Sequence, residues 1–401
     1  MSLFFSVVPV TEAIATVRRI AVRTKTETVP LDHACGRVLA EDIVSDIDIP
    51  GFTRSVMDGY AVLATDTAGA SESSPAMLTL AGRVQMGMDA EPGVRPGECS
   101  YIPTGGILPK GTNAVVMAEN TEQFGDGILV KKPAAPGENI IRYNEDFQKG
   151  TTVLPGGRRL SPQDLGVLAA AGYAMVPVAA MPRFGIISTG NELVTVDTVP
   201  DIGQVRDVNS YVIAAFLESH GCIPVKYGIL KDDPDIFART LAKAVAECDA
   251  VLISGGSSKD ERDITAGIIE QSGEVFIHGV AIAPGKPTII GRCGTVPVIG
   301  LPGHPAATFV GMVITVRNLI EAMTGDTSAG PVTTPARLAT NVPSTRGRED
   351  YIRVVVKEGT ATPLFGKSGL LNTLAQGNGL LRVPAESEGL EAGETVDIIL
   401  L

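Results

Sequence analysis

Four short apolar runs in this chain each end at a glycine-rich turn. FGII (184–187) precedes STGNEL, AVLI (250–253) precedes SGGSS, VAIA (280–283) precedes PGKPT, and VPVI (296–299) precedes GLPGHP. Continuous apolar runs are typical of strands buried in a parallel sheet, and ligands bind such sheets beyond the carboxyl ends of the strands. Glycine there lets backbone N–H groups approach a phosphate closely. Residues 182–327 are therefore predicted to form an α/β domain that binds an anionic ligand.

Apolar residues at helical spacing predict helices between these strands. Ile213, Phe216 and Leu217 share one face of a helix that ends before Gly221, and residues 237–248 repeat the pattern. A third helix is expected over 305–324, with proline at its start and glycine just after its end. Strands that alternate with helices indicate crossovers in a mainly parallel sheet, arranged in three layers.

The remaining segments predict three further regions. Helical spacing of apolar residues at 10–21 predicts an amphipathic helix, and residues 1–30 are grouped with 148–181 in a helical linker region. Residues 31–147, with runs such as MLTLAGRV and AVVMAE, predict a β-rich domain. YIRVVV, LLRV and ETVDIIL predict a small β-barrel over 328–401. The expected fold class is multidomain, α/β plus β.

An uncharged stretch from Leu165 to Pro182 raises the question of a membrane span. Gly172 and Pro177 interrupt it, and a span needs about 20 predominantly apolar residues. A short helix that begins after Ser161 and is followed by a strand is the favoured interpretation.

The overall charge argues against nucleic-acid binding. The 401 residues include 33 basic and 45 acidic side chains, a net charge of −12, whereas binding to a polyanion needs the opposite sign. Five cysteines without C-x-x-C spacing and four histidines without H-x-x-x-H spacing disfavour a zinc site or a disulfide framework. The apolar first ten residues lack a preceding basic segment, so a signal peptide is not expected. The expected location is the cytoplasm.

The segment SGGSSKDERD (254–263) follows the second apolar run directly. Its possible donors to a phosphate or to the edge of a pterin are Ser254, Gly255, Gly256, Ser257 and Ser258. Asp263 places a carboxylate at the start of the next helix, and a carboxylate beside phosphates is a natural Mg²⁺ ligand. The alternative is a flexible turn followed by a helix-capping aspartate.

The other turns offer weaker signals, each with a structural alternative. In STGNEL, Ser188, Thr189 and Gly190 are possible donors and Glu192 is a second acid, or the segment is a helix cap. Lys286 of PGKPT suits a phosphate, or is a solvated lysine. Pro302, Gly303 and Pro305 form a tight turn, in which His304 is expected to be a loop or capping residue. Asp232 and Asp233 open a helix, where capping is the default.

Three polar residues of the predicted β-rich domain are also candidates. Asp58 lies in an Asp-Gly turn, and Thr104 and Asp146 lie in loops. Considered singly, each of these residues is expected to stabilise a turn and not to take part in catalysis.

Taken together, these segments resemble the molybdopterin molybdenumtransferase family, MoeA and the related E domain of gephyrin, over essentially the whole chain. The motifs that occur in the family's order are PGFTRSVMDGYAV, IPTGG, NEDF, GIISTGNEL, GQVRDVNS, GILKDDP, SGGSSKDERD, PGKPT and GLPGHP. The resemblance implies insertion of molybdenum from molybdate into adenylated molybdopterin, with Mg²⁺-assisted release of AMP. It also implies four domains, an elongated homodimer, and an adenylyltransferase that supplies the adenylated ligand.

The same resemblance implies roles for individual residues. Asp58, Thr104 and Asp146 of one subunit would face the SGGSS turn of the other. The implied catalytic residues are Asp58, Thr104, Asp146, Glu192 and Asp263, of which Asp58, Asp146, Glu192 and Asp263 would hold the metal. The implied ligand-binding residues are Ser188, Thr189, Gly190, Asp207, Asn209, Asp232, Asp233, Ser254, Gly255, Gly256, Ser257, Ser258, Lys286, Pro302, Gly303, Pro305, Arg348 and Ser368. Sulfurs of the pterin, not protein cysteines, would hold molybdenum.

The chain departs from the family pattern near the ligand. Ala283 stands where many relatives have lysine, His304 stands where asparagine is usual, and Ala307 replaces a common hydroxyl residue. These changes leave molybdate and tungstate both open as substrates.

Two other functions are compatible with the motifs. One is a non-catalytic dimeric scaffold, against which the retained acids argue. The other is an adenylyltransferase or pyrophosphatase on the same α/β module, against which the β-rich domain and the C-terminal barrel argue.

Overall fold

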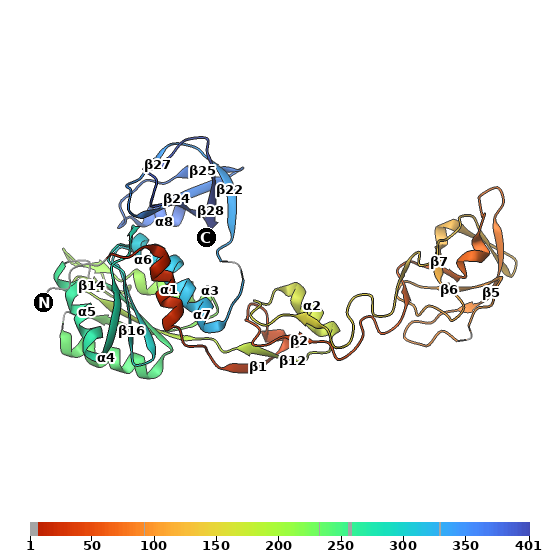
Figure 1. The fold of residues 1–401 in the computed structure, drawn as a ribbon, viewed down its shortest axis with the longest axis horizontal. Helices are drawn as coiled ribbons and strands as arrows, with labels where there is room; N and C mark the ends of the chain where they lie inside the picture. The colour runs from red at the N-terminus through yellow and green to blue at the C-terminus, as the bar shows by residue number, and fades with distance from the viewer. Residues whose placement is uncertain (1–6, 92, 232, 256–258, 329) are drawn as a thin grey trace. The chain divides into compact units, whose positions relative to one another are not determined.

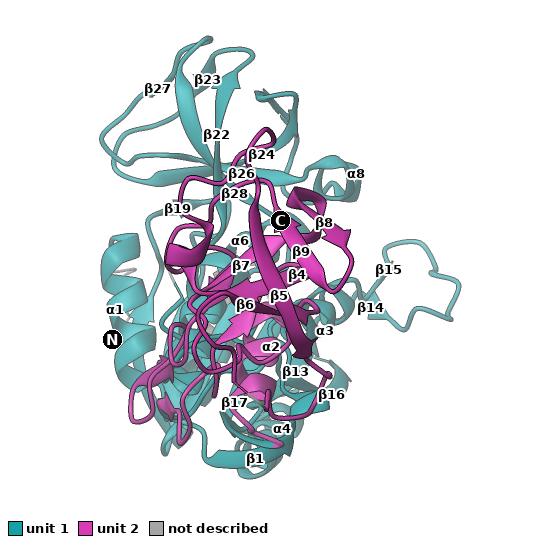
Figure 2. Ribbon diagram, turned by 90° about the vertical axis from the view of Figure 1, so that its right-hand side faces the viewer, with its two compact units in different colours: residues 1–41, 156–161, 175–401 teal, residues 42–155, 162–174 magenta. Residues whose placement is uncertain are grey.

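The computed structural model describes residues 7–91, 93–231, 233–255, 259–328 and 330–401, without the side chains of residues 259–264. These residues fall into two compact units (Figure 2). Unit 1 comprises Met1–Glu41, Gly156–Ser161 and Met175–Leu401, and unit 2 comprises Asp42–Pro155 and Pro162–Ala174.

A six-stranded sheet forms the centre of unit 1, in the order β16-β13-β17-β21-β20-β18. Its strands are β13 (Arg183–Thr189), β16 (Ile223–Leu230), β17 (Ala250–Gly255), β18 (Gly273–His278), β20 (Ile289–Cys293) and β21 (Val296–Leu301). The first four strands in this order run parallel to one another. Strand β20 runs antiparallel to β21, and the edge strand β18 runs antiparallel to β20. FGII, AVLI and VPVI thus form three parallel strands, as predicted.

Helices cover both faces of this sheet (Figure 1). They are α1 (Val10–Ile20), α3 (Asn209–Ser219), α4 (Pro234–Glu247), α5 (Lys259–Ser272), α6 (Pro305–Gly311), the π-helix η4 (Met312–Val316) and α7 (Arg317–Thr324). Ile186 and Leu252 belong to the core beneath α1, α3 and α7, whereas Ile187 and Val251 belong to the core beneath α4 and α5. Strands β13, β17 and β21 are apolar and buried along nearly their whole length because helices cover both of their faces, which confirms the predicted three layers, whereas the edge strands β16 and β18 are partly exposed.

The predicted third helix of this region is continuous from Pro305 to Thr324 and ends at Gly325, whose φ is +74°. By length and composition this stretch could cross a membrane. However, 78% of its apolar window is buried inside the structure. It is therefore a packing helix of the α/β core.

The first helix differs from its predicted grouping. Helix α1 packs on α7, η4 and β20, and its buried residues Val10, Ala13 and Val17 belong to the α/β core. Arg18 on its exposed face pairs with Glu321 of α7 at 2.8 Å. The amphipathic stripe of α1 is thus buried in the α/β core and not in a separate linker region, although β1 (Thr26–Pro30) does pair with β12 (Met175–Ala179). The other limits of the four domains stay a prediction.

The C-terminal strands close into a barrel, as predicted. Its strands are β22 (Thr333–Leu338), β24 (Glu349–Lys357), β25 (Thr360–Pro363), β26 (Gly379–Val383) and β28 (Thr395–Leu400), with β24 paired to both β25 and β26. Short elements accompany it, namely β23 (Val342–Pro343), β27 (Gly389–Leu390) and α8 (Leu371–Gln376). Leu338, Val354 and Ile398 form its core.

The run VAIA (280–283), unlike the other three apolar runs, does not join the α/β sheet. Strand β19 (Ile282–Ala283), in VAIA, pairs in parallel with β24 of the barrel sheet. The reason is topological: β18 and β20 pair with each other as antiparallel neighbours, so the run between them lies in their connection. The prediction of a buried parallel strand here is wrong.

Unit 2 contains a second six-stranded sheet, in the order β7-β4-β6-β5-β9-β8. Its strands are β4 (Gly59–Val62), β5 (Ala76–Arg83), β6 (Glu98–Ile102), β7 (Ala114–Met117), β8 (Thr121–Phe124) and β9 (Gly127–Val130). Four shorter strands are β2 (Ile43–Val44), β3 (Arg54–Ser55), β10 (Ile140–Ile141) and β11 (Thr152–Leu154). Short 3₁₀ turns lie at Ala64–Thr67 and Ala118–Asn120, and another, Leu31–His33, belongs to unit 1. Helix α2 (Pro162–Ala170) is followed by β12, as predicted for the uncharged stretch.

Candidate functional site

The carboxyl ends of β13 and β17 meet at one edge of the α/β sheet, where Thr189 lies opposite Gly255. Gly255 has a φ of +139°, and a Cβ atom there would lie 2.0 Å from the Thr189 carbonyl oxygen. Gly190, with a φ of +150°, would bring a Cβ atom to 2.7 Å from the Glu192 carboxylate. Only glycine fits these two positions, which explains why both turns begin with it.

A cavity of 670 Å³ lies at this edge; we call it the strand-end pocket. Its walls come from the two strand ends, the loop that contains β14 (Leu193–Val194) and β15 (Val205–Arg206), the start of α3, and the GLPGHP turn. The lining residues that the sequence predicted are Thr189, Glu192, Asp207, Asn209, Ser254, Gly255, Gly303 and Pro305. The position agrees with the rule that ligands bind beyond the carboxyl ends of parallel strands.

Asn209 joins three of these walls. Its side-chain Nδ2 donates to the Ser254 hydroxyl at 2.8 Å and to the Gly303 carbonyl oxygen at 2.7 Å. Because a carbonyl oxygen only accepts, the orientation of the amide is fixed. Asn209 is only 8% exposed, and its Oδ1 has no hydrogen-bond partner among the described residues. An unsatisfied buried acceptor beside a cavity is unusual and suits a ligand that donates an N–H or O–H.

The Asp207 carboxylate connects Ser188 of β13 to the first turn of α3 by hydrogen bonds. Ser188 donates to one carboxylate oxygen of Asp207 at 2.8 Å, and the Ser210 backbone N–H donates to the other at 3.1 Å. Ser188 is 1% exposed and does not line the pocket. In this structure Ser188, predicted to bind the ligand, instead holds Asp207 in place.

Lys231 fixes the loop that carries Glu192. Its Nζ donates to the carbonyl oxygens of Asn191 and Leu193 at 2.9 and 2.8 Å. Glu192 itself is exposed and lines the strand-end pocket. Lys231 was not predicted from the sequence. The available signal was its position directly after β16, whose carboxyl end lies at the same edge of the sheet.

A second cavity, of 520 Å³, gathers three cationic side chains. We call it the basic pocket, and its cations are Lys286, Arg346 and Arg348. Pro302 and Ser368 also line it, so four residues predicted separately to bind the ligand meet here and not in the strand-end pocket. Three cationic side chains around one cavity favour an anion, with Arg346 also paired to Glu388 at 3.5 Å.

Asp350 holds one of these cations. It is 5% exposed, accepts from the Arg348 Nε at 2.9 Å, and accepts from the Ser344 hydroxyl at 2.9 Å. Arg348 itself is exposed at the cavity. The guanidinium group is therefore tied to the barrel wall by a buried carboxylate and not by a surface ion pair.

Glu349 anchors the same strand, β24, against β19. Arg382 donates to it twice, at 2.7 and 2.8 Å, Tyr351 donates at 2.6 Å, and its own N–H donates to the Ala281 carbonyl oxygen. Burial raises the pKa of the Glu349 carboxyl, but the hydrogen bonds from Arg382 and Tyr351 outweigh burial and lower it. Glu349 is thus held ionised where the barrel meets β19.

His304 lines both pockets. It precedes Pro305 at the start of α6, and its Nδ1 lies 2.8 Å from the Ser368 hydroxyl, while its side chain makes no capping bond. The predicted loop position is correct, but the ring's place between two cavities was not foreseen. Its only signal was a histidine between a glycine and the first proline of a helix.

The remaining predicted residues of unit 1 are placed as follows. Asp233 caps α4, with its Oδ1 accepting from the N–H groups of Asp235 and Ile236 at 3.0 and 3.1 Å, which is the structural alternative given above. Asp232, Gly256, Ser257, Ser258 and the side chain of Asp263 lie outside the described residues.

In unit 2 the structure brings Asp58 and Thr104 together. The Asp58 Oδ1 accepts from the Thr104 backbone N–H at 2.7 Å and from its hydroxyl at 3.1 Å. The next residue, Gly59, begins β4 so close to its neighbour that a Cβ atom would lie 2.0 Å from the Val116 carbonyl oxygen. Asp146 is exposed on another loop of the unit, where its N–H donates to the Ile49 carbonyl oxygen at 3.0 Å.

The predicted metal ligands do not form a cation site within the described part of one chain. No three His, Cys, Asp or Glu side chains gather there. Glu192 is at the strand-end pocket, and both oxygens of Asp207 are engaged by Ser188 and Ser210. Mg²⁺ is usually held by one or two carboxylates together with substrate phosphates, so Glu192 at the strand-end pocket is compatible with such a site, while the side chain of Asp263 lies outside the described residues.

An open α/β sheet with a strand-end pocket and an adjoining basic pocket is typical of a protein that binds an anionic ligand. Three family models match in sequence: MoeA N-terminal region (domain I and II) at 8–172, probable molybdopterin binding domain at 185–322, and MoeA C-terminal region (domain IV) at 335–401. The chain belongs to the MoeA family.

Individual relatives agree over nearly their whole length. The chain is 38% identical to a putative molybdopterin biosynthesis protein of Methanocaldococcus jannaschii, covering 94% of this chain and 92% of the relative. It is 32% identical to the molybdopterin molybdenumtransferase of Bacillus subtilis, covering 98% and 94%. A crystal structure of a molybdopterin biosynthesis MoeA protein from Pyrococcus horikoshii superposes with a TM-score of 0.87 at 37% identity, covering 99% and 100%. The predicted family is therefore confirmed.

Proposed function

We propose that this protein is a molybdopterin molybdenumtransferase that acts in molybdenum cofactor biosynthesis. The observation on which this rests is the pair of cavities that share His304. One has hydroxyls, glycines and a buried acceptor suited to an adenylated pterin, and the other has three cations suited to an oxyanion. The name of the Bacillus subtilis relative supports the same reaction.

The two cavities divide the substrates between them. Adenylated molybdopterin lies in the strand-end pocket, where the Asn209 Oδ1 accepts a pterin N–H and the Ser254 side of the pocket faces phosphate. Molybdate lies in the basic pocket, where Arg348 and Lys286 offset its charge and the Ser368 hydroxyl donates to an oxygen. Adjacent sites bring the oxyanion to the dithiolene sulfurs without a protein ligand to molybdenum.

Release of AMP is a hydrolysis of the phosphoanhydride. A water oxygen bonds to phosphorus, the bond from that phosphorus to the bridging oxygen breaks, and AMP separates from molybdopterin phosphate. The water proton passes to Asp58, whose two bonds from Thr104 both end on Oδ1 and leave Oδ2 for the water. The family resemblance adds Mg²⁺, with Asp58, Asp146, Glu192 and Asp263 as its implied ligands, and this remains a prediction.

We further infer that the working enzyme is a homodimer in which Asp58 and Thr104 of one subunit complete the pocket of the other. Around Asp58, unit 2 exposes Phe52, Met57 and Tyr143 at 40–48%. The loop beside the strand-end pocket, which includes β14 and β15 in Figure 2, exposes four more apolar residues, Val196, Val199, Ile202 and Val205. Apolar side chains gathered on a surface mark sites of protein contact, and here both groups border predicted site residues.

The reaction is tested by incubating the purified chain with adenylated molybdopterin, Mg²⁺ and either molybdate or tungstate, and measuring AMP and assembled cofactor. Oxyanion-dependent AMP release is expected. Glu192→Gln and Asp58→Asn should each lower the rate at least about a hundredfold, whereas Asp126→Asn, outside both sites, should not. Release that does not depend on either oxyanion contradicts the proposal and favours a simple pyrophosphatase.

Mixing two inactive variants tests the shared site. Asp58→Asn and Glu192→Gln subunits that exchange should form mixed dimers with one intact site, so about a quarter of the wild-type rate returns. If all the site residues belong to one subunit, each site in the mixed dimer still has one defect and no activity returns. The oligomeric state is checked in parallel by native mass spectrometry.

The supply of the ligand completes the proposal. The adenylated pterin is made by an adenylyltransferase, with which this protein would work in the cytoplasm. Channelling between the two is expected to appear as AMP release that an added trap for free adenylated pterin does not reduce.

A further inference from the structure

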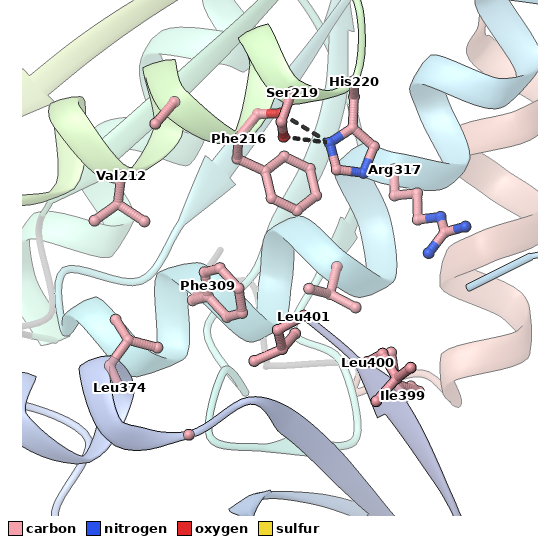
Figure 3. A pocket seen from close by; sticks show the side chains of 13 residues that line it. Val212, Phe216, Ser219, His220, Phe309, Arg317, Leu374, Ile399, Leu400 and Leu401 are labelled. Carbon is pink, nitrogen blue, oxygen red and sulfur yellow. Dashed lines mark hydrogen bonds between the residues drawn. The ribbon is translucent and has the colours of Figure 1, made fainter. Parts of the chain in front are cut away.

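A third cavity has a volume of 510 Å³, and Figure 3 shows the side chains that line it. We call it the helix pocket. It is lined by Val212, Ala215, Phe216, Ser219, His220, Phe309, Val313, Arg317, Leu374, Gly377, Ile399, Leu400 and Leu401. Within the described chain it shares no lining residue with the strand-end pocket or the basic pocket. Its volume is within the range of small-molecule sites.

Most of the wall is apolar and aromatic. The rings of Phe216 and Phe309 meet edge to face, with centroids 6.2 Å apart at 88°. His220 stacks on the other side of Phe216, with centroids 4.1 Å apart at 19°. Figure 3 shows the two phenylalanine rings facing the space between α3, α6 and the C-terminal strand. Such surfaces favour a flat aromatic ring, which adds edge-to-face contacts to its apolar burial.

One end of the pocket is polar and has positive charge. His220 Nδ1 lies 2.8 Å from the Phe216 carbonyl oxygen, which only accepts, so this nitrogen carries the hydrogen and Nε2 of the neutral ring is an acceptor. Arg317 forms an ion pair with Glu321, to which its Nε donates at 3.0 Å, and its Nη2 donates to the Gly330 carbonyl oxygen, so Nη1 is the nitrogen left for a ligand. Among the described lining residues there is no acidic side chain, in a chain whose net charge is −12. The guanidinium group of Arg317 therefore suits an acidic substituent on a ligand, whereas Nε2 of His220 suits a donor on the same ligand.

We propose that the helix pocket binds a small aromatic molecule that carries an acidic group. The ring occupies the space beside Phe216 and Phe309, and the acidic group lies toward Arg317. The polar end and the aromatic wall set both the class of ligand and its orientation. This site is independent of the molybdenumtransferase function, because none of its residues is used there.

The test uses two fluorescent probes and the full-length protein. 8-Anilinonaphthalene-1-sulfonate has the aromatic body and the acidic group, and N-phenyl-1-naphthylamine has the same body without the charge. One saturable site is expected for the sulfonate, with at least about tenfold tighter binding than for the amine. Arg317→Met should bring the two affinities together. Equal affinity of the two probes for the wild-type protein would show that no acidic group is recognised.

A variant that fills the pocket gives a second, separate test. Ala215 is an exposed residue on α3 that lines the pocket, so Ala215→Trp should fold and should weaken sulfonate binding at least about tenfold. Ala242→Trp, on the exposed face of α4, is the matched control and should leave binding unchanged. Undiminished binding in Ala215→Trp overturns the proposal. If Ala215→Trp instead changes the oligomeric state of the protein and leaves dye binding undiminished, the pocket is a contact surface for a second copy of the chain, and the proposal is likewise overturned.

Discussion

Asn209 ties the first turn of α3 to the end of β17, because its amide nitrogen donates to the Ser254 hydroxyl at 2.8 Å. The same nitrogen reaches the Gly303 carbonyl oxygen at 2.7 Å, in the turn before α6. One buried side chain thus holds together three segments that are far apart in sequence. The geometry of the strand-end pocket depends on it.

Replacing Asn209 with alanine should therefore affect both stability and ligand binding. The Gly303 carbonyl oxygen would lose its buried donor, so the free energy of unfolding should fall by about 1–3 kcal/mol. Urea titration measures this change, and binding of adenylated molybdopterin should weaken in the same variant. Asn372→Ala, at an exposed position in α8, is the control and should stay within about 0.5 kcal/mol. Unchanged stability in Asn209→Ala would remove its assigned structural role.

Gly255→Ala should be among the most damaging single changes in the α/β sheet. The new Cβ atom would lie 2.0 Å from the Thr189 carbonyl oxygen, at a φ of +139° that other residues rarely adopt. A loss of about 2–4 kcal/mol is expected in urea denaturation. Gly267→Ala in α5 is the matched control, because a Cβ there meets nothing within 4 Å and alanine favours a helix by about 1 kcal/mol. A similar effect at both positions would contradict the close approach of the two strand ends.

Local pattern was sufficient to predict the strands of the α/β sheet but not their partners. FGII, AVLI and VPVI became parallel strands because both of their faces are buried, a condition visible in the sequence. VAIA has the same composition, yet β19 pairs with β24 of the barrel because β18 and β20 already pair with each other. Pairing is a long-range property, which composition does not encode.

The residues of the candidate site also divide into those that local sequence predicts and those that depend on contacts made in the fold. Residues next to glycine turns, such as Thr189 and Ser254, could be predicted because the turn itself marks the end of a strand. Ser188 alternates with Thr189 and faces inward toward Asp207, so its role depends on a residue 19 positions away. Lys231 acts through loop carbonyl oxygens, which leave no mark on the sequence. Contacts of this kind become visible only when the chain is folded.

His220 should make the protein less stable as the pH falls below the ordinary imidazole pKa of 6.5. Burial lowers the pKa of its imidazole below the ordinary value of 6.5, the bond to the Phe216 carbonyl oxygen opposes this, and the charge of Arg317 adds to the lowering. The unfolded chain therefore takes up this proton at a higher pH than the folded chain does. The stabilisation is complete above pH 6.5 and is lost as the pH falls toward the pKa of the folded state.

Urea midpoints at pH 7.5 and 5.5 measure this effect. His220→Gln should reduce the loss of stability between the two pH values, because the variant has no imidazole to take up a proton. His33→Gln, which changes an exposed histidine, should leave the difference as it is in the wild type. If His220→Gln preserves the full pH dependence, another group is responsible.

Asp350 should control the affinity of the basic pocket through Arg348. The carboxylate is 5% exposed and bonds to the Arg348 Nε at 2.9 Å, so Asp350→Asn removes the charge that holds the guanidinium group but keeps the size of the side chain. The KM for molybdate should rise by about tenfold, with kcat changed much less, because Asp350 does not touch the substrate. Asp397→Asn, an exposed change in the same barrel, should leave both constants unaltered. A fall in kcat at unchanged KM would show instead that Asp350 acts on the reaction itself.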